Sequence, residues 1–297
     1  MIYKGIFTAV VTPFDKNNKV DYLTLEKLLI KQIEAKVNGV VIAGSTGEGS
    51  SLEDCEYVKL IEKSIAISQK KIPLIAAVVG VSTSSVIQKI KTLSSMNIDG
   101  IMCTVPHYVK PEQDGLYEHF KFINNASRYP LMIYLHPGRT GVNMSDDLII
   151  KLSLLDNVRA IKDCSNDLTK PLRLSNKVRA DSLTFLTGDD GNNLAYSANG
   201  GKGCVSVIAN IVPKLCMKIN MLLASNDFNA AKSFYEKLVP LTLAIFSESN
   251  PIGIKCALSQ LGYCEDRLIL PLTSARKDTK AKISILLPEV MKLEDDV

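Results

Sequence analysis

The sequence has 297 residues, of which 46% are apolar and 22% are charged, and its 35 basic and 31 acidic side chains leave a net charge of +4. This balance is typical of a globular protein and excludes a disordered chain. The charge is small and the basic residues are scattered rather than clustered with aromatic residues, which argues against a nucleic-acid-binding protein.

The cysteines and histidines argue against a metal site. Seven cysteines occur without a CxxC spacing, and the three histidines form no ligand-spaced pair with cysteines or carboxylates. We therefore expect no zinc or iron, and we interpret the cysteines as small apolar residues of a reducing compartment. No apolar run approaches 18 residues and the start has no signal pattern, so we expect a cytoplasmic protein without membrane spans.

Short apolar runs alternate with helical patterns along most of the chain. The runs cover residues 5–11, 40–43, 72–79, 99–104, 130–135, 158–162, 183–186 and 203–208. The helical patterns cover residues 21–37, 52–69, 82–96, 112–124, 146–155, 167–176, 193–199 and 211–224, with Asp21 and Ser145 as expected N-caps.

Eight strands, each apolar on both faces and each followed by a helix, predict an α/β fold of the TIM (β/α)8 barrel type. An open doubly wound sheet would give the same alternation. However, the glycine-rich segment 44–49 matches neither a dinucleotide-binding motif nor a P-loop, so the barrel is favoured.

After residue 208 only helical patterns follow, at 227–246, 252–261 and 279–287. We therefore expect a barrel over residues 1–224 and a small C-terminal helical appendage over residues 225–297. The acidic end, residues 294–296, is expected to be frayed.

Lys162 is the most informative residue because it stands at the end of an apolar strand. A buried ammonium is costly, so a lysine there either finds a partner or becomes a neutral amine, which can form a Schiff base with a carbonyl substrate. The alternative is that Lys162 is the first polar residue after the strand and points to water.

Other polar groups follow the strand ends, where barrels of this type build their active sites. Ser45 and Thr46 follow the second strand, Tyr108 the fourth, Tyr134 and Arg139 the fifth, and Gly188 the seventh. Each has an ordinary explanation, such as a turn, a packed aromatic ring or a solvated arginine. Together they suit imine chemistry on an anionic keto acid.

The sequence resembles the dihydrodipicolinate synthase / N-acetylneuraminate lyase family of class I pyruvate-dependent aldolases, and is most similar to the synthases. The resemblance extends over essentially the whole chain. It is carried by Thr8, Val11-Thr12-Pro13-Phe14, Asp21, Gly44-Ser45-Thr46-Gly47-Glu48, Tyr134, Pro137, Arg139-Thr140-Gly141, Ile161-Lys162-Asp163, Gly188-Asp189-Asp190, Gly201, Gly203, Val205-Ser206, Asn250-Pro251-Ile252 and Lys255.

The resemblance implies that Lys162 forms the imine with pyruvate, so that no separate cofactor is needed. It implies that Tyr134 transfers protons and that Ser45 or Thr46, with Tyr108, extends a hydroxyl relay from it. The segment 44–48 would bind the pyruvate carboxylate.

The resemblance also places Gly188 and Val205 near the bound keto acid. In the family the residue that matches Tyr108 reaches into a neighbouring subunit's site, which implies a homodimer or a homotetramer.

The second substrate is indicated by Arg139, which resembles the arginine with which the synthases hold the carboxylate of aspartate semialdehyde. A synthase of this type would make a cyclic dipicolinate precursor for lysine biosynthesis. The segment 135–138 reads Leu-His-Pro-Gly where synthases have Asn-Val-Pro-Ser, and Ser45 stands where they have Thr. Since specificity depends on such contacts, an aldolase that releases pyruvate from N-acetylneuraminate or a 2-keto-3-deoxy sugar acid remains an alternative.

A third interpretation is a keto-acid-binding protein that has lost turnover, although the sequence lacks no expected catalytic group. Lysine-inhibited relatives carry Asn and Glu after the third strand and a Tyr before the residue that matches Tyr108. Residues 81–86 hold neither Asn nor Glu, and His107 replaces that Tyr, so inhibition by lysine is not expected.

Overall fold

The computed structural model describes residues 3–178 and 183–297. Its strands follow one another in the order β1 to β8 of a closed barrel, which confirms the predicted TIM barrel. Every strand pair resolved in register is parallel. The strands are Gly5–Ala9 (β1), Gly39–Ile42 (β2), Leu74–Val78 (β3), Gly100–Thr104 (β4), Leu131–Leu135 (β5), Val158–Asp163 (β6), Thr184–Thr187 (β7) and Gly203–Ser206 (β8).

The strands are almost wholly buried, as strands covered on both faces should be. In β4 and β5 every residue is buried, and in β6 only Arg159 is exposed. The near-continuous apolar runs of the sequence therefore reflect a barrel packed inside and outside.

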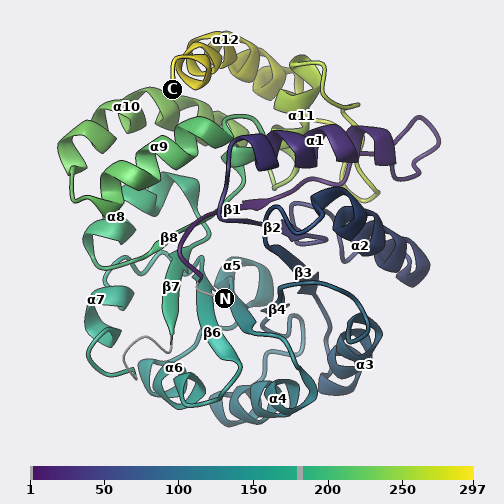
Figure 1. Ribbon diagram of the computed structural model, residues 1–297, viewed down its shortest axis with the longest axis vertical. Helices are drawn as coiled ribbons and strands as arrows, with labels where there is room; N and C mark the ends of the chain where they lie inside the picture. Colours follow the sequence, from purple (N-terminus) through teal and green to yellow (C-terminus); the bar gives the residue numbers. More distant parts are fainter. Residues whose placement is uncertain (1–2, 179–182) are drawn as a thin grey trace. The chain divides into compact units, whose positions relative to one another are not determined.

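The chain falls into two compact units, and the first holds Ile75–Val205 together with Tyr3 and Lys4. Figure 1 shows its larger helices outside the strands that they connect. These helices are Thr83–Leu93 (α3), Gln113–Ala126 (α4), Pro137–Thr140 (α5), Asp146–Ser153 (α6), Lys170–Leu174 (α7) and Asn193–Ala198 (α8), and a 3-10 turn covers Asp190–Asn192 (η1).

The second unit holds Gly5–Leu74 and Ser206–Val297. Within it the helices Phe228–Ile245 (α10) and Lys277–Asp295 (α12) run side by side (Figure 1). Its helices are Tyr22–Glu34 (α1), Asp54–Ser68 (α2), Pro213–Ala224 (α9), Phe228–Ile245 (α10), Ile252–Gln260 (α11) and Lys277–Asp295 (α12), and a 3-10 turn covers Ile208–Asn210 (η2). The predicted boundary at residues 224 and 225 stays a prediction.

The expected caps at Asp21 and Ser145 are confirmed. The Asp21 carboxylate accepts hydrogen bonds from the backbone amides at the start of α1, and the Ser145 hydroxyl accepts one from Leu148 N. Each cap satisfies an amide that the helix itself leaves without a partner.

The prediction of a frayed C-terminus was wrong. Helix α12 continues through Pro288 to Asp295, and the buried Glu294 carboxylate accepts hydrogen bonds from Lys214 N at 3.1 Å and Leu215 N at 2.8 Å. Glu294 therefore caps the start of α9 from a distant part of the chain, a contact that sequence pattern does not reveal. None of the helices in the described ranges is long and apolar enough to cross a membrane.

Candidate active site

Lys162 lies inside the barrel wall, at the fifth position of β6. Its strand neighbours in register are Tyr134 on β5 and Leu186 on β7. The residue is 4% exposed, and its Nζ lies 4.1 Å from the centroid of the Tyr134 ring. Among the residues that the structure describes, no carboxylate forms an ion pair with it. Lys162 therefore does not point to water, and the alternative considered for it is excluded.

The surroundings of Lys162 favour its neutral form. Burial lowers the pKa of the amine, because the ammonium loses its hydration, and the positive charge of Arg139 lowers that pKa further. Cys164, Cys204 and Asp190 oppose the shift, but burial prevails. A lowered pKa raises the fraction of neutral amine, and only the neutral amine has the lone pair required for attack on a carbonyl.

Gly188 makes room for the lysine. Its amide donates to Asp163 O at 2.9 Å, which fixes it beside the end of β6. A Cβ at this position would lie 2.3 Å from Cys164 Sγ and 2.5 Å from Lys162 Cε. Only glycine fits there without displacing the side chain that carries the amine.

Tyr134 is buried beside Lys162 and hydrogen-bonds the Cys164 side chain. Burial raises the pKa of the Cys164 thiol to about 11, so the thiol is neutral near pH 7. The Tyr134 ring also meets His136 edge to face, with centroids 5.8 Å apart. These contacts hold the phenol against the amine.

A buried polar network holds the end of β6. Asp163 pairs with Lys170 Nζ at 3.0 Å, and accepts hydrogen bonds from Tyr196 Oη at 3.1 Å and Ser165 N at 2.9 Å. Lys170 also donates to Ser165 Oγ at 2.7 Å. Because each buried charge is paired and hydrogen-bonded, the segment that follows Lys162 is rigidly placed.

Arg139 and His136 lie on or next to α5, a single helical turn after β5 that the sequence did not predict. Arg139 is exposed at the end of this turn, where its guanidinium can meet a ligand from solvent. Burial, with the charges of Arg139 and Lys162, lowers the pKa of His136 to about 4, so its imidazole is neutral. His136 adds no positive charge beside the amine.

Tyr108 and Val205 have opposite surroundings. Val205 on β8 is fully buried. Tyr108 is 87% exposed, has a φ of +70°, and is the middle residue of a three-residue turn closed by a 2.8 Å bond from Val109 N to His107 O. Such turns are strained for a side chain other than glycine. The structure therefore presents Tyr108 outward.

Ser45 and Thr46 belong to the second unit, in the loop of residues 43–49 after β2. Thr46 is buried, and its Oγ1 accepts a hydrogen bond from Asn250 Nδ2 at 2.9 Å. Thr12 Oγ1 donates to Gly47 O at 2.6 Å, and Gly49 N donates to Gly44 O at 3.1 Å. A backbone hydrogen bond therefore closes the loop, and hydrogen bonds from Thr12 and Asn250 hold it in place.

Sequence reasoning assigned no role to Cys164, and it named Glu48 and Lys255 only as residues that carry the family resemblance, without predicting that they contact each other. A usable signal existed for Cys164, since it stands two residues after Lys162 and alternation places both on one face of an extended segment. The contacts of Glu48 and Lys255 link segments about two hundred residues apart and left no local signal.

A buried amine with no carboxylate partner in the described ranges lies next to a buried phenol in a closed parallel barrel, and this arrangement is typical of enzymes of the class I aldolase type, which act through an imine on lysine. The particular family follows from comparison with known proteins. The model of the Dihydrodipicolinate synthetase family matches residues 2–290. The chain belongs to this family, which confirms the predicted lyase.

The similarity to known relatives extends over nearly the whole length of both chains. Proteins called 4-hydroxy-tetrahydrodipicolinate synthase from Rickettsia bellii (strain OSU 85-389) and Rickettsia canadensis (strain McKiel) are 44% and 42% identical to this chain, each over 96% of it and 97% of the relative. The dihydrodipicolinate synthase structure from Thermotoga maritima has a TM-score of 0.94 at 32% identity, covering 98% of this chain and 99% of its own. The synthase from Acinetobacter baumannii, solved with pyruvate, has a TM-score of 0.93 at 34% identity, covering 97% and 99%.

Proposed function

We propose that this protein condenses pyruvate with aspartate semialdehyde through an imine on Lys162, the reaction of a 4-hydroxy-tetrahydrodipicolinate synthase in lysine biosynthesis. The observation that carries the proposal is the buried Lys162 amine, which has no carboxylate partner in the described ranges and lies against the Tyr134 ring. The names of the relatives, at 42–44% identity, favour this reaction over the pyruvate-releasing aldolase that the sequence left open.

In the proposed reaction the Lys162 nitrogen attacks the C2 carbonyl of pyruvate, and loss of water gives the imine. Loss of a proton from the C3 methyl gives an enamine, whose carbon attacks the aldehyde of the semialdehyde. The amino group of the semialdehyde then adds to the imine carbon, which closes the ring and releases Lys162. No step requires a further cofactor.

Tyr134 is proposed to carry the protons of these steps, because its phenol is packed beside the amine. Thr46 and Ser45, with Tyr108, would extend the relay as the family resemblance implies. The 43–49 loop would hold the carboxylate of pyruvate, since a closed loop with amides and hydroxyls suits an anion.

Three further residues are proposed to shape the substrate sites. Gly188 and Val205 would line the space around the keto acid, and the close approach of Gly188 to Lys162 supports this. Arg139 would bind the carboxylate of the semialdehyde, which its exposed guanidinium at the end of α5 permits.

Tyr108 is proposed to contact a second copy of the chain in a homodimer or a homotetramer. Its exposure, and that of Val109 beside it, support a contact surface, because a large side chain is held outward in a strained turn. One solved relative at 32% identity is described as a monomeric variant. Sedimentation analysis of this chain tests the proposal, and a monomer would contradict it.

A coupled assay with purified enzyme tests the reaction. We expect product only when pyruvate and aspartate semialdehyde are both present, and none with Lys162→Ala. Turnover of N-acetylneuraminate or a 2-keto-3-deoxy sugar acid, with no product from the first pair, would contradict the proposal.

A further inference from the structure

Glu48 and Lys255 form an ion pair inside the second unit that the proposed reaction does not use. Lys255 is fully buried, and the Glu48 side chain is 1% exposed. Burial lowers the pKa of Lys255, and the charge of Glu48 opposes that shift. Because two buried charges are costly to desolvate, a pair of this kind must be held by good geometry.

The pair joins the 43–49 loop to the segment 267–269. Glu48 Oε2 accepts a hydrogen bond from Ile269 N at 2.7 Å. Lys255 Nζ donates to Arg267 O at 2.8 Å and lies 4.1 Å from the centroid of the Phe14 ring. Each charge therefore binds its partner and also a backbone group of the same distant segment.

A second contact joins the 43–49 loop to the region around α11. Asn250 stands just before α11, which carries Lys255, and donates the hydrogen bond to Thr46 Oγ1. The loop itself has little freedom, because Glu48 has a φ of +53° and a Cβ on Gly49 would overlap Ala43 O. A shift of Glu48 is therefore passed on to Thr46 and Ser45.

We propose that Glu48 and Lys255 are positioning residues that set the 43–49 loop for a 2-oxo acid carboxylate. The inference rests on the proposed function, since it takes this loop as the carboxylate site. The side chains of both residues bind each other and backbone groups of residues 267 and 269, so we propose that they act on the substrate only through the position of the loop. Their removal should weaken pyruvate binding more than it slows the later chemistry.

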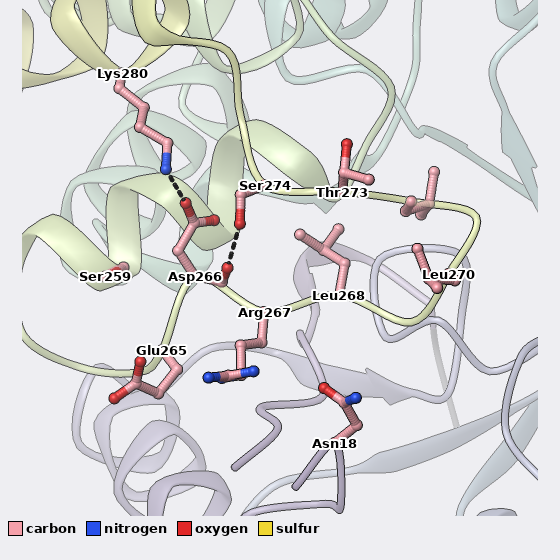
Figure 2. A pocket seen from close by; sticks show the side chains of 11 residues that line it. Asn18, Ser259, Glu265, Asp266, Arg267, Leu268, Leu270, Thr273, Ser274 and Lys280 are labelled. Atoms are coloured by element: carbon pink, nitrogen blue, oxygen red, sulfur yellow. Dashed lines mark hydrogen bonds and ion pairs between the residues drawn. The ribbon is translucent and has the colours of Figure 1, made fainter. Parts of the chain in front are cut away.

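A second lysine–carboxylate pair near the segment 267–269 offers a control for Lys255→Met. There, Arg267 and Leu268 line a cavity of about 530 Å³, and Lys280 pairs with Asp266 at 2.7 Å (Figure 2). The Lys280 side chain is 43% exposed, so water screens this pair. Lys280→Met removes a lysine–carboxylate pair beside the same segment without touching the 43–49 loop.

The experiment compares Lys255→Met, Glu48→Gln and Lys280→Met. Pyruvate binding is measured as the concentration dependence of borohydride trapping and of deuterium exchange into the pyruvate methyl group, and folding is checked by thermal melting. For Lys255→Met we expect the pyruvate concentration at half-saturation to rise about tenfold or more, with the saturating exchange rate changed by less than about threefold.

Glu48→Gln keeps an oxygen that accepts from Ile269 N, so we expect a smaller rise, and Lys280→Met should match the wild type. If Lys255→Met does not fold, Glu48→Gln alone decides. Folded variants with unchanged half-saturation would overturn the inference, as would an equal rise in Lys280→Met. Absence of trapping in the wild type would instead overturn the proposed function, so the two failures are distinguishable.

Discussion

Substituting Gly188 by alanine tests how closely the side chain of Lys162 packs against this glycine. The added methyl would lie 2.3 Å from Cys164 Sγ and 2.5 Å from Lys162 Cε, where ordinary contacts are 3.4–4 Å. Overpacking of this kind costs about 1–3 kcal/mol. Cys164 is fixed through its amide, which donates to Leu135 O at 2.8 Å, whereas Cε is near the flexible end of a long side chain. The lysine is therefore the group that moves.

A displaced Lys162 should form the imine more slowly. If half of the cost appears in this step, about 0.5–1.5 kcal/mol, trapping of pyruvate slows by about two- to twelvefold, since 1.36 kcal/mol corresponds to a factor of ten. The assay is the rate of borohydride-dependent pyruvate incorporation, followed by mass spectrometry of the intact protein.

The matched control is Gly115→Ala, on α4. A Cβ there meets only Pro111 Cβ at 3.6 Å, an ordinary contact, so trapping should proceed at the wild-type rate. A Gly188→Ala variant that traps pyruvate as fast as Gly115→Ala, with an unchanged melting temperature, would show that an added methyl group does not displace Lys162.

Three further predictions concern the chemistry of the site. Tyr134→Phe should slow deuterium exchange into pyruvate by about 10²-fold, the loss expected for a positioned proton donor, and an unchanged rate would exclude the relay. Arg139→Ala should raise the KM for aspartate semialdehyde while pyruvate trapping persists, and a loss of trapping would show that Arg139 serves the first step instead. Because burial lowers the pKa of Lys162, its neutral amine persists below the ordinary lysine value of about 10.4, and the trapping rate should fall only as pH drops through the lowered pKa. A titration midpoint at the ordinary value would contradict the burial argument.

The fold could be predicted because its signals are local and repeated. Strands buried on both faces leave unbroken apolar runs, and the helices between them begin at caps such as Asp21. The errors occurred where distant contacts decide the structure. Glu294 was predicted to lie in a frayed acidic end, yet it caps α9, and α12 continues to Asp295, beyond the predicted end of the helix at residue 287.

The sequence predicts which residues form the candidate site, but it does not predict how their side chains pack against one another. The position of Lys162 at a strand end, and of Tyr134 on the preceding strand, follows from the alternation of strands and helices. The contact of Gly188 with the lysine stem and the bond between Cys164 and Tyr134 depend on how loops close in space. The Glu48–Lys255 pair likewise joins segments that no periodicity connects.

The most direct test of the account is to locate the trapped pyruvate. The enzyme is reduced with borohydride in the presence of pyruvate, digested, and analysed by peptide mass spectrometry. We expect one adduct, on the peptide that contains Lys162, and none in the Lys162→Ala variant. An adduct on another lysine, or no adduct in an enzyme that still turns over, would contradict it.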